Sequence, residues 1–111
     1  MKTKFILDSG DTEEYKEISA LAEEKGSELW GSTTNPSLIA KSAGDRLKGE
    51  KLTMEEAFEL QRKIVMEILE IVPGAVSAEV YADRDTKAED MAKQGREIAR
   101  WDRRVVVKLP T

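Results

Sequence analysis

The chain has 111 residues, which is enough for one domain with a real hydrophobic core. Its formal net charge is −4, and charges of both signs are interspersed, so no field is present that would recruit nucleic acid or an anionic membrane surface. The absence of cysteine and histidine excludes disulfides, thiolate nucleophiles, zinc-finger ligands and imidazole bases, which leaves carboxylates, amines and hydroxyls for any chemistry.

No linker rich in proline or serine interrupts residues 1–111, which we therefore interpret as a single domain. No apolar run is long enough to span a bilayer, and the run that follows Met1-Lys2-Thr3-Lys4 is too short for the core of a signal peptide. We expect a cytoplasmic protein.

The first apolar run, residues 5–7, predicts a strand that ends at Asp8. A helix is expected next, because Asp11 has the N-cap position with Glu14 three residues later, and Gly26 provides a stop. The residues expected on its packed face are Tyr15, Ile18, Leu21 and Ala22.

A second strand is predicted at residues 29–34, although Gly31 interrupts it. It leads into Asn35 and Pro36, which fit the cap and first turn of a short helix that continues to about Ser42. The longest helix is predicted at residues 54–72, opened by Thr53 with Glu56. Its expected buried residues are Ala57, Phe58, Ile64, Val65, Ile68 and Leu69.

After Pro73-Gly74, residues 75–80 predict a third strand, and residues 105–109 predict a fourth. Between them, Thr86 with Glu89 predicts the start of a helix. The residues expected on its inner face are Ala88, Met91, Ala92, Gly95, Ile98 and Ala99. Strands that alternate with helices predict an α/β fold with parallel pairing and right-handed crossovers.

Lys108 follows Val105-Val106-Val107, a strand that we expect to be too hydrophobic to be exposed. An apolar, poorly hydrated wall disfavours the charged form of a lysine, and a neutral amine attacks carbonyls to form a Schiff base. Lys108 is therefore a candidate nucleophile. The alternative stays open, because most lysines that follow a strand are solvated loop residues.

Three other strands also end in polar groups, namely Asp8, Asn35 and Glu79. Ligands of parallel α/β sheets bind at the carboxyl ends of the strands, and alternation of side chains sends these groups and Lys108 to one face. Each has a simpler explanation as well: Asp8 could cap a turn, Asn35 could cap its helix, and Glu79 could be solvated.

Four segments carry a family resemblance: Phe5-Ile6-Leu7-Asp8-Ser9, Thr33-Thr34-Asn35-Pro36-Ser37-Leu38-Ile39, Val76-Ser77-Ala78-Glu79-Val80 and Val105-Val106-Val107-Lys108-Leu109-Pro110-Thr111. Their content and order resemble the first four strand motifs of the transaldolase family of class I aldolases. The resemblance implies four parallel βα units, the N-terminal half of a TIM (β/α)8 barrel, because the chain is about half the roughly 250 residues of a complete barrel. It also implies no metal or organic cofactor.

The resemblance further implies transfer of a dihydroxyacetone unit between sugar phosphates, with Lys108 forming the Schiff base and Asp8 accepting a proton. Glu79 matches the carboxylate that positions a water, and Asn35 would bind a substrate hydroxyl, with support from Thr33. The fructose-6-phosphate aldolase branch has glutamine where this chain has Glu79, so glutamate favours transaldolase. The aldolase activity remains an alternative, as does a non-catalytic half-barrel.

The sequence also predicts an incomplete barrel, because four strands leave the first and fourth with unpaired edges. In the family, the groups that hold the substrate phosphate come from later strands, so we expect little activity from this piece. We expect self-association into a homo-oligomer through the strand edges. Arg100, Arg103 and Arg104 precede the fourth strand and are interpreted as cations suited to a helix C-terminus.

Overall fold

The computed structural model describes residues 3–47, 53–80 and 85–109. Four strands alternate with helices, and two helices lie between the second and third strands. The elements are β1 (Lys4–Asp8), α1 (Thr12–Glu24), β2 (Glu28–Thr33), α2 (Pro36–Leu47), α3 (Met54–Ile71), β3 (Val76–Glu79), α4 (Ala88–Ala99) and β4 (Val105–Lys108).

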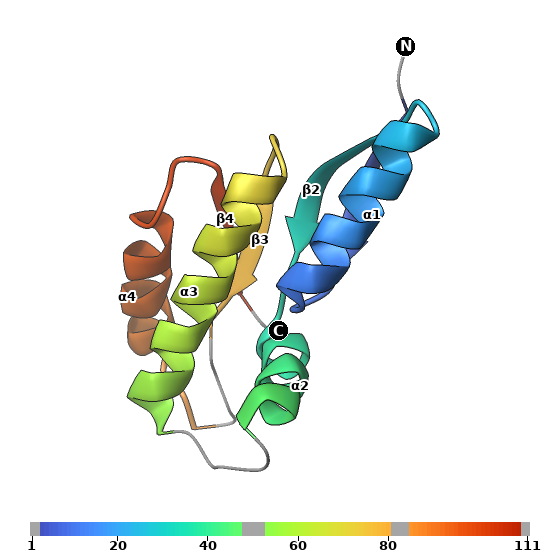
Figure 1. Ribbon diagram of the computed structural model, residues 1–111. Coiled ribbons are helices and arrows are strands. Elements are labelled where there is room, and N and C mark those ends of the chain that lie inside the picture. The colour runs from blue at the N-terminus through green and yellow to red at the C-terminus, as the bar shows by residue number, and fades with distance from the viewer. Residues whose placement is uncertain (1–2, 48–52, 81–84, 110–111) are drawn as a thin grey trace.

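The strands form one parallel sheet in the order β1-β2-β3-β4, as expected for half of a barrel. Figure 1 shows α1, α3 and α4 on one face of this sheet, while α2 lies beyond the carboxyl ends of the strands. All carboxyl ends therefore meet at one edge, next to α2. Among the described residues, none of the helices is long and apolar enough to cross a membrane.

The core lies between α3 and the middle of the sheet. Ile64, Val65 and Ile68 of α3 are fully buried against Val76 and Ala78 of β3. The predicted capping box at the start of α3 is confirmed, because Thr53 and Glu56 exchange side-chain and backbone hydrogen bonds. Ala57 and Phe58 are only half-buried.

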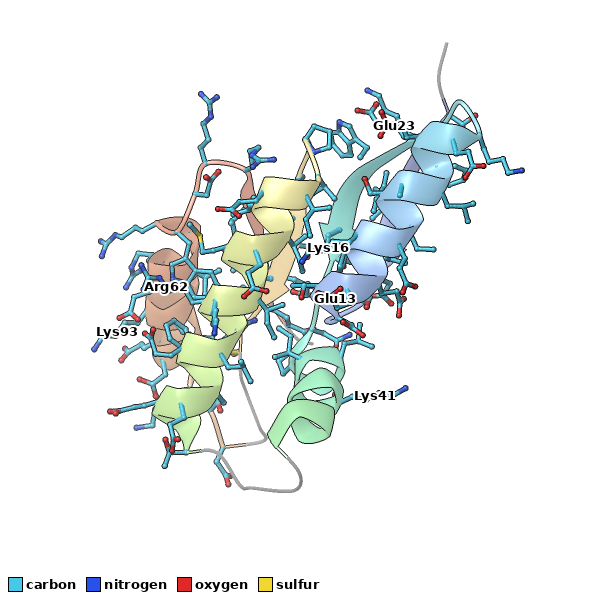
Figure 2. The ribbon with its side chains drawn as sticks, viewed as in Figure 1. Glu13, Lys16, Glu23, Lys41, Arg62 and Lys93 are labelled. Carbon is cyan, nitrogen blue, oxygen red and sulfur yellow. The ribbon has the colours of Figure 1, made fainter. Side chains whose placement is uncertain are left out.

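The outer surface of the helices carries the charged residues. Glu13 and Lys16 of α1 form an ion pair with their atoms 3.2 Å apart, and Figure 2 shows Lys16 between α1 and α3. Arg62 of α3 and Lys93 of α4 also lie on this side of the molecule. An exposed ion pair such as that of Glu13 and Lys16 contributes little to stability, so the fold depends on the core.

Two predictions for α1 are confirmed and one is wrong. Asp11 is the N-cap and accepts from Glu13 N, and the chain leaves the helix at Gly26 with φ of 76°. Leu21, expected on the packed face, is 51% exposed. The reason is that α1 lies over the edge of the sheet, where no described element covers its outer flank.

The predicted start of α4 at Thr86 is wrong. The helix begins at Ala88, and its N-cap residue, Lys87, makes no side-chain cap hydrogen bond. Lysine has no acceptor to offer, and two acidic residues in the first turn favour the positive end of the helix dipole instead. Gly95 and Ile98 are buried and Met91 is half-buried, but three alanines expected to face inward are exposed, because α4 covers only the edge strand: Ala88, Ala92 and Ala99.

Tyr15 joins the first turn of α1 to the carboxyl ends of β1 and β2. Its buried hydroxyl donates to Ser9 O at 2.7 Å and Leu7 O at 3.0 Å, and it is also hydrogen-bonded to Ser32 Oγ. Burial raises the pKa of Tyr15 from its ordinary value of 10.0 to about 12, against the hydrogen bond from Ser32, which lowers it. The neutral phenol is therefore part of the folded structure.

Replacement of Tyr15 by phenylalanine is expected to lower the free energy of unfolding by about 2 kcal/mol near pH 8, because two carbonyls and a hydroxyl lose their partner. Since the raised pKa means that the unfolded chain loses the phenolic proton first, the stabilisation by Tyr15 is fully present below pH 10 and declines as pH rises to about 12. Urea unfolding of both proteins at pH 8, 10 and 11 measures this. A difference between them that does not change with pH would contradict the assignment.

Candidate functional site

The strand register sets out the predicted site residues in two rows. Asp8 is paired with Thr33, and Thr33 with Ser77. Two residues farther along β3, Glu79 is paired with Lys108. Directly paired residues of parallel strands point to the same face, with their Cα atoms about 4.8 Å apart. Glu79 and Lys108 are therefore neighbours, as are Asp8 and Thr33.

These residues lie on the face of the sheet opposite α1, α3 and α4, which we call the inner face. On β3, Val76 and Ala78 are buried beneath the helices, so that Ser77 and Glu79 point the other way. On β4, Val107 packs against the core while Lys108 is exposed. Lys108 is thus directed away from the helical layer, toward the side of Glu79.

The contact between Asp8 and Thr33 depends on a β-bulge. Thr33 Oγ1 donates to Asp8 Oδ1 at 2.8 Å. The register shifts between Phe5 and Ile6, where Phe5 pairs with Leu29 but Ile6 pairs with Gly31. Without this extra residue on β2, Asp8 would lie beside Ser32 and the hydroxyl of Thr33 would point away.

The structure does not bring Asp8 to Lys108. They lie on the two edge strands, three strand spacings or roughly 14 Å apart across the sheet. Among the described residues, no ion pair joins Lys108 to Asp8 or to Glu79. The described chain thus places Glu79 beside Lys108 and leaves Asp8 on the edge strand at the other side of the sheet.

The expectation that residues 105–107 form a strand too apolar to be exposed is wrong. Val106 is 53% exposed, and Lys108 and Leu109 are exposed as well. The inner face has no covering layer in the described residues, so that alternate side chains of β4 meet solvent. Pro110 and Thr111, at the end of the fourth motif, lie outside the described residues.

Asn35 caps α2, which extends beyond the predicted end at Ser42 to Leu47. Its Oδ1 accepts from Leu38 N at 2.9 Å. The prediction that Asn35 caps its helix is therefore confirmed. Since Oδ1 is occupied, the group that Asn35 can offer to a ligand is its Nδ2 amide, a donor.

The turn after Asp8 lies directly against the first turn of α2. A Cβ on Gly10 would come within 2.8 Å of the backbone of Leu38 and Ile39, so only glycine permits this approach. A cavity of about 250 Å³ lies here, lined by Asp8, Ser9, Gly10, Asp11, Glu14, Leu38 and Lys41. A larger one of about 540 Å³ lies between α3 and α4, away from the inner face.

No described group of three or more acidic side chains is arranged to hold a metal ion.

Of the three arginines before β4, Arg104 binds backbone carbonyls near the amino end of β3, away from the candidate site. Arg104 donates to Leu69 O at 2.6 Å, Val72 O at 2.6 Å and Gly74 O at 3.2 Å. A cation at a helix C-terminus was expected, but the helix is α3, whereas Arg100 and Arg103 are exposed.

Two residues that the sequence analysis did not single out form hydrogen bonds to backbone carbonyls of β3 beside the site. Thr34 is buried, and its Oγ1 donates to Ser77 O at 2.7 Å. Gln61 is fully buried on α3, and its Nε2 donates to Glu79 O at 2.8 Å. The helical period that places Ile64, Val65 and Ile68 inside also includes position 61, and this was the available signal.

Comparison with known proteins gives consistent matches over nearly all of the chain. A model of the transaldolase/fructose-6-phosphate aldolase family matches residues 5–111. A probable transaldolase of Thermus thermophilus is 45% identical over 108 residues, which are 97% of this chain and 42% of that protein. Probable transaldolases of Phocaeicola vulgatus and a Thermoanaerobacter species are 41% and 36% identical over 107 residues, 96% of this chain and 40% and 39% of their own lengths. The chain spans about two fifths of these relatives.

Substitutions at Asn35 separate its capping role from its amide donor. Asn35→Ala is expected to lower the free energy of unfolding by about 1 kcal/mol, because Leu38 N loses its acceptor. Asn35→Asp keeps an acceptor there, and its stability is expected to stay within about 0.5 kcal/mol of the original. Urea unfolding measures both, with Ser37→Ala as an exposed control in the same turn. Equal losses in the alanine and aspartate variants would show that the cap is not the stabilising feature.

Proposed function

Because the chain belongs to the transaldolase/fructose-6-phosphate aldolase family, we propose that it carries the Schiff-base half of a transaldolase-like site. The observation that carries this proposal is the pairing of Lys108 with Glu79 on the inner face. The substrate would be a ketose phosphate, and the reaction would transfer a dihydroxyacetone unit to an aldehyde acceptor. Such a reaction belongs to cytoplasmic carbohydrate metabolism, in the pentose phosphate pathway.

In this proposal, Lys108 Nζ attacks the substrate ketone to give a carbinolamine, which loses water to give an iminium ion. A water held by Glu79 carries protons between the departing hydroxyl and solvent. Asp8 takes the proton of the substrate hydroxyl next to the bond that breaks. The electrons of that carbon–carbon bond pass to the iminium, which becomes an enamine as the remaining fragment of the donor leaves as an aldehyde. The enamine then attacks the acceptor aldehyde, which takes up a proton, and hydrolysis of the resulting imine releases the product from Lys108.

Asp8 lies on the far edge from Lys108, which supports imine formation as the step that this chain performs and little complete turnover. Nδ2 of Asn35 would donate to a substrate hydroxyl, and Thr33 would orient Asp8 through their hydrogen bond. An aldolase that releases free dihydroxyacetone is the alternative within the family. A side-by-side assay for free dihydroxyacetone and for transferred product distinguishes the two.

The Schiff base is tested by reduction with sodium borohydride in the presence of fructose 6-phosphate. We expect the chain to gain the mass of one reduced sugar phosphate, mapped to Lys108 by peptide mass spectrometry. Lys108→Met is expected to abolish the gain. Lys4→Met, which removes an exposed lysine at the amino end of β1, is expected to leave it unchanged. An unmodified Lys108 at saturating substrate would count against the proposal.

A second candidate is a half-barrel that associates with itself, with or without chemistry. Large apolar side chains are exposed along both edge strands: Ile6 is 60% exposed, Val106 53% and Phe5 48%. Two copies related by a two-fold axis would place β4 of each beside β1 of the other, which removes all four unpaired edges.

Light scattering after size exclusion tests this association. We expect a dimer mass at micromolar concentration, and we expect Val106→Lys to give a monomer because it places a charge in the joined inner face. Met66→Lys introduces the same charge at an exposed apolar residue of α3, and is expected to remain dimeric. A monomeric original chain at every concentration would refute self-association.

A further inference from the structure

The hydrogen-bond ladder between β2 and β3 stops one step before Glu79. Ser32 N donates to Ala75 O, and Thr34 N donates to Ser77 O, each at 3.0 Å. In a parallel ladder the next donor is two residues farther along each strand, so residue 36 would donate to Glu79 O. Residue 36 is a proline and has no N–H. The ladder therefore leaves the carbonyl of Glu79 without its strand partner.

Gln61 supplies the missing donor from the other side of the sheet. It lies on α3 and is fully buried, and its Nε2 donates to Glu79 O at 2.8 Å. The same end of β3 is held to β4 by a hydrogen bond of 3.0 Å from Val80 N to Lys108 O. Gln61 thus closes a short connection from α3 through Glu79 to Lys108.

A buried glutamine at this position lowers the stability of the fold, because one of its polar atoms is left without a hydrogen bond. Its Oε1 is buried with no hydrogen-bond partner, a state that destabilises a protein unless something compensates it. The neighbouring positions on the same helical face hold Ile64, Val65 and Ile68, so an apolar residue would suit the packing. Among the described residues, the only hydrogen bond of the Gln61 side chain is the one to Glu79 O.

We infer that Gln61 is a positioning residue: it replaces the N–H absent from Pro36, fixes the backbone of Glu79, and thereby sets the direction of the Glu79 side chain beside Lys108. The inference rests on the proposed function for its catalytic meaning, but its structural part stands separately. Gln61 lies behind the sheet and does not touch substrate. Its effect reaches the chemistry through the end of β3.

Amide hydrogen exchange tests the positioning without any catalysis. Gln61→Met keeps the length of the side chain and removes its donor. We expect exchange of Val80 N–H to accelerate at least tenfold relative to that of Val76 N–H, which is bonded to Arg104 O at the other end of β3. The ratio removes any change in global stability. Lys63→Met, at an exposed position of α3, is the matched control and is expected to leave the ratio unchanged.

Borohydride trapping with fructose 6-phosphate tests the consequence for Lys108. In Gln61→Met we expect the maximal rate of adduct formation to fall about tenfold, because Glu79 is misplaced, while the substrate concentration for half-maximal rate stays within about twofold. A merely structural loss would lower the amount of folded protein and leave this rate per folded molecule unchanged.

The two measurements fail separately. An unchanged ratio of Val80 to Val76 exchange in Gln61→Met overturns the inference, whatever the trapping result. An accelerated Val80 with an unchanged maximal trapping rate also overturns it, because the freed strand end would then not affect the amine. If the original chain forms no adduct, the proposed function fails for this chain, and the exchange ratio still decides whether Gln61 holds Glu79.

Discussion

The parallel register of the four strands is the constraint on which the candidate site depends. Side chains alternate along a strand, so a shift of one residue between neighbours would send Glu79 or Lys108 to the helical face. The register that pairs these two residues also pairs Asp8 with Thr33, but only because a bulge opposite Phe5 and Ile6 adds one residue to β2. An amine and a carboxylate are therefore adjacent through backbone pairing, without any ion pair that holds them together.

The carboxyl edge of the sheet is held by polar side chains that supply what the backbone ladder lacks. Tyr15 satisfies two carbonyls at the end of β1, Asn35 caps the helix that follows β2, and Gln61 satisfies the last carbonyl of β3. At the opposite edge, Arg104 satisfies the carbonyls at the end of α3. Each of these contacts links elements that are not adjacent in the sheet ladder or closes a helix end, which explains why polar groups are buried in a small core.

The sequence was sufficient for features that local patterns determine. Apolar runs and helical periods predict the order of strands and helices, and residues within one turn predict the capping box at Thr53 and the cap at Asn35, although the same kind of pattern at Thr86 misplaces the start of α4. Exposure could not be predicted in the same way: Leu21 and Val106 have the pattern of packed residues, but their burial depends on a neighbour that the described chain does not provide. The bulge had a signal in Gly31, and the helical period of α3 gave one for the burial of Gln61, but the hydrogen bond from Gln61 to Glu79 joins residues far apart in the sequence and has no local pattern.

The exposure of Lys108 and the unpaired edges of β1 and β4 have the same physical cause, which is that nothing among the described residues closes the sheet or covers its inner face. Lys108 is exposed because the described residues place no layer over the inner face, and water therefore reaches the amine. In the same wet surroundings, attraction between Glu79 and Lys108 is weak, since the effective dielectric is high. A layer over the inner face would remove this water, strengthen every charge interaction there, and, by curving the sheet into a closed barrel, carry Asp8 toward Lys108 across the interior. The covering that satisfies the edges of β1 and β4 is therefore the same one that would bring Asp8 to the amine and complete the site, whether further strands or a second copy of the chain provide it.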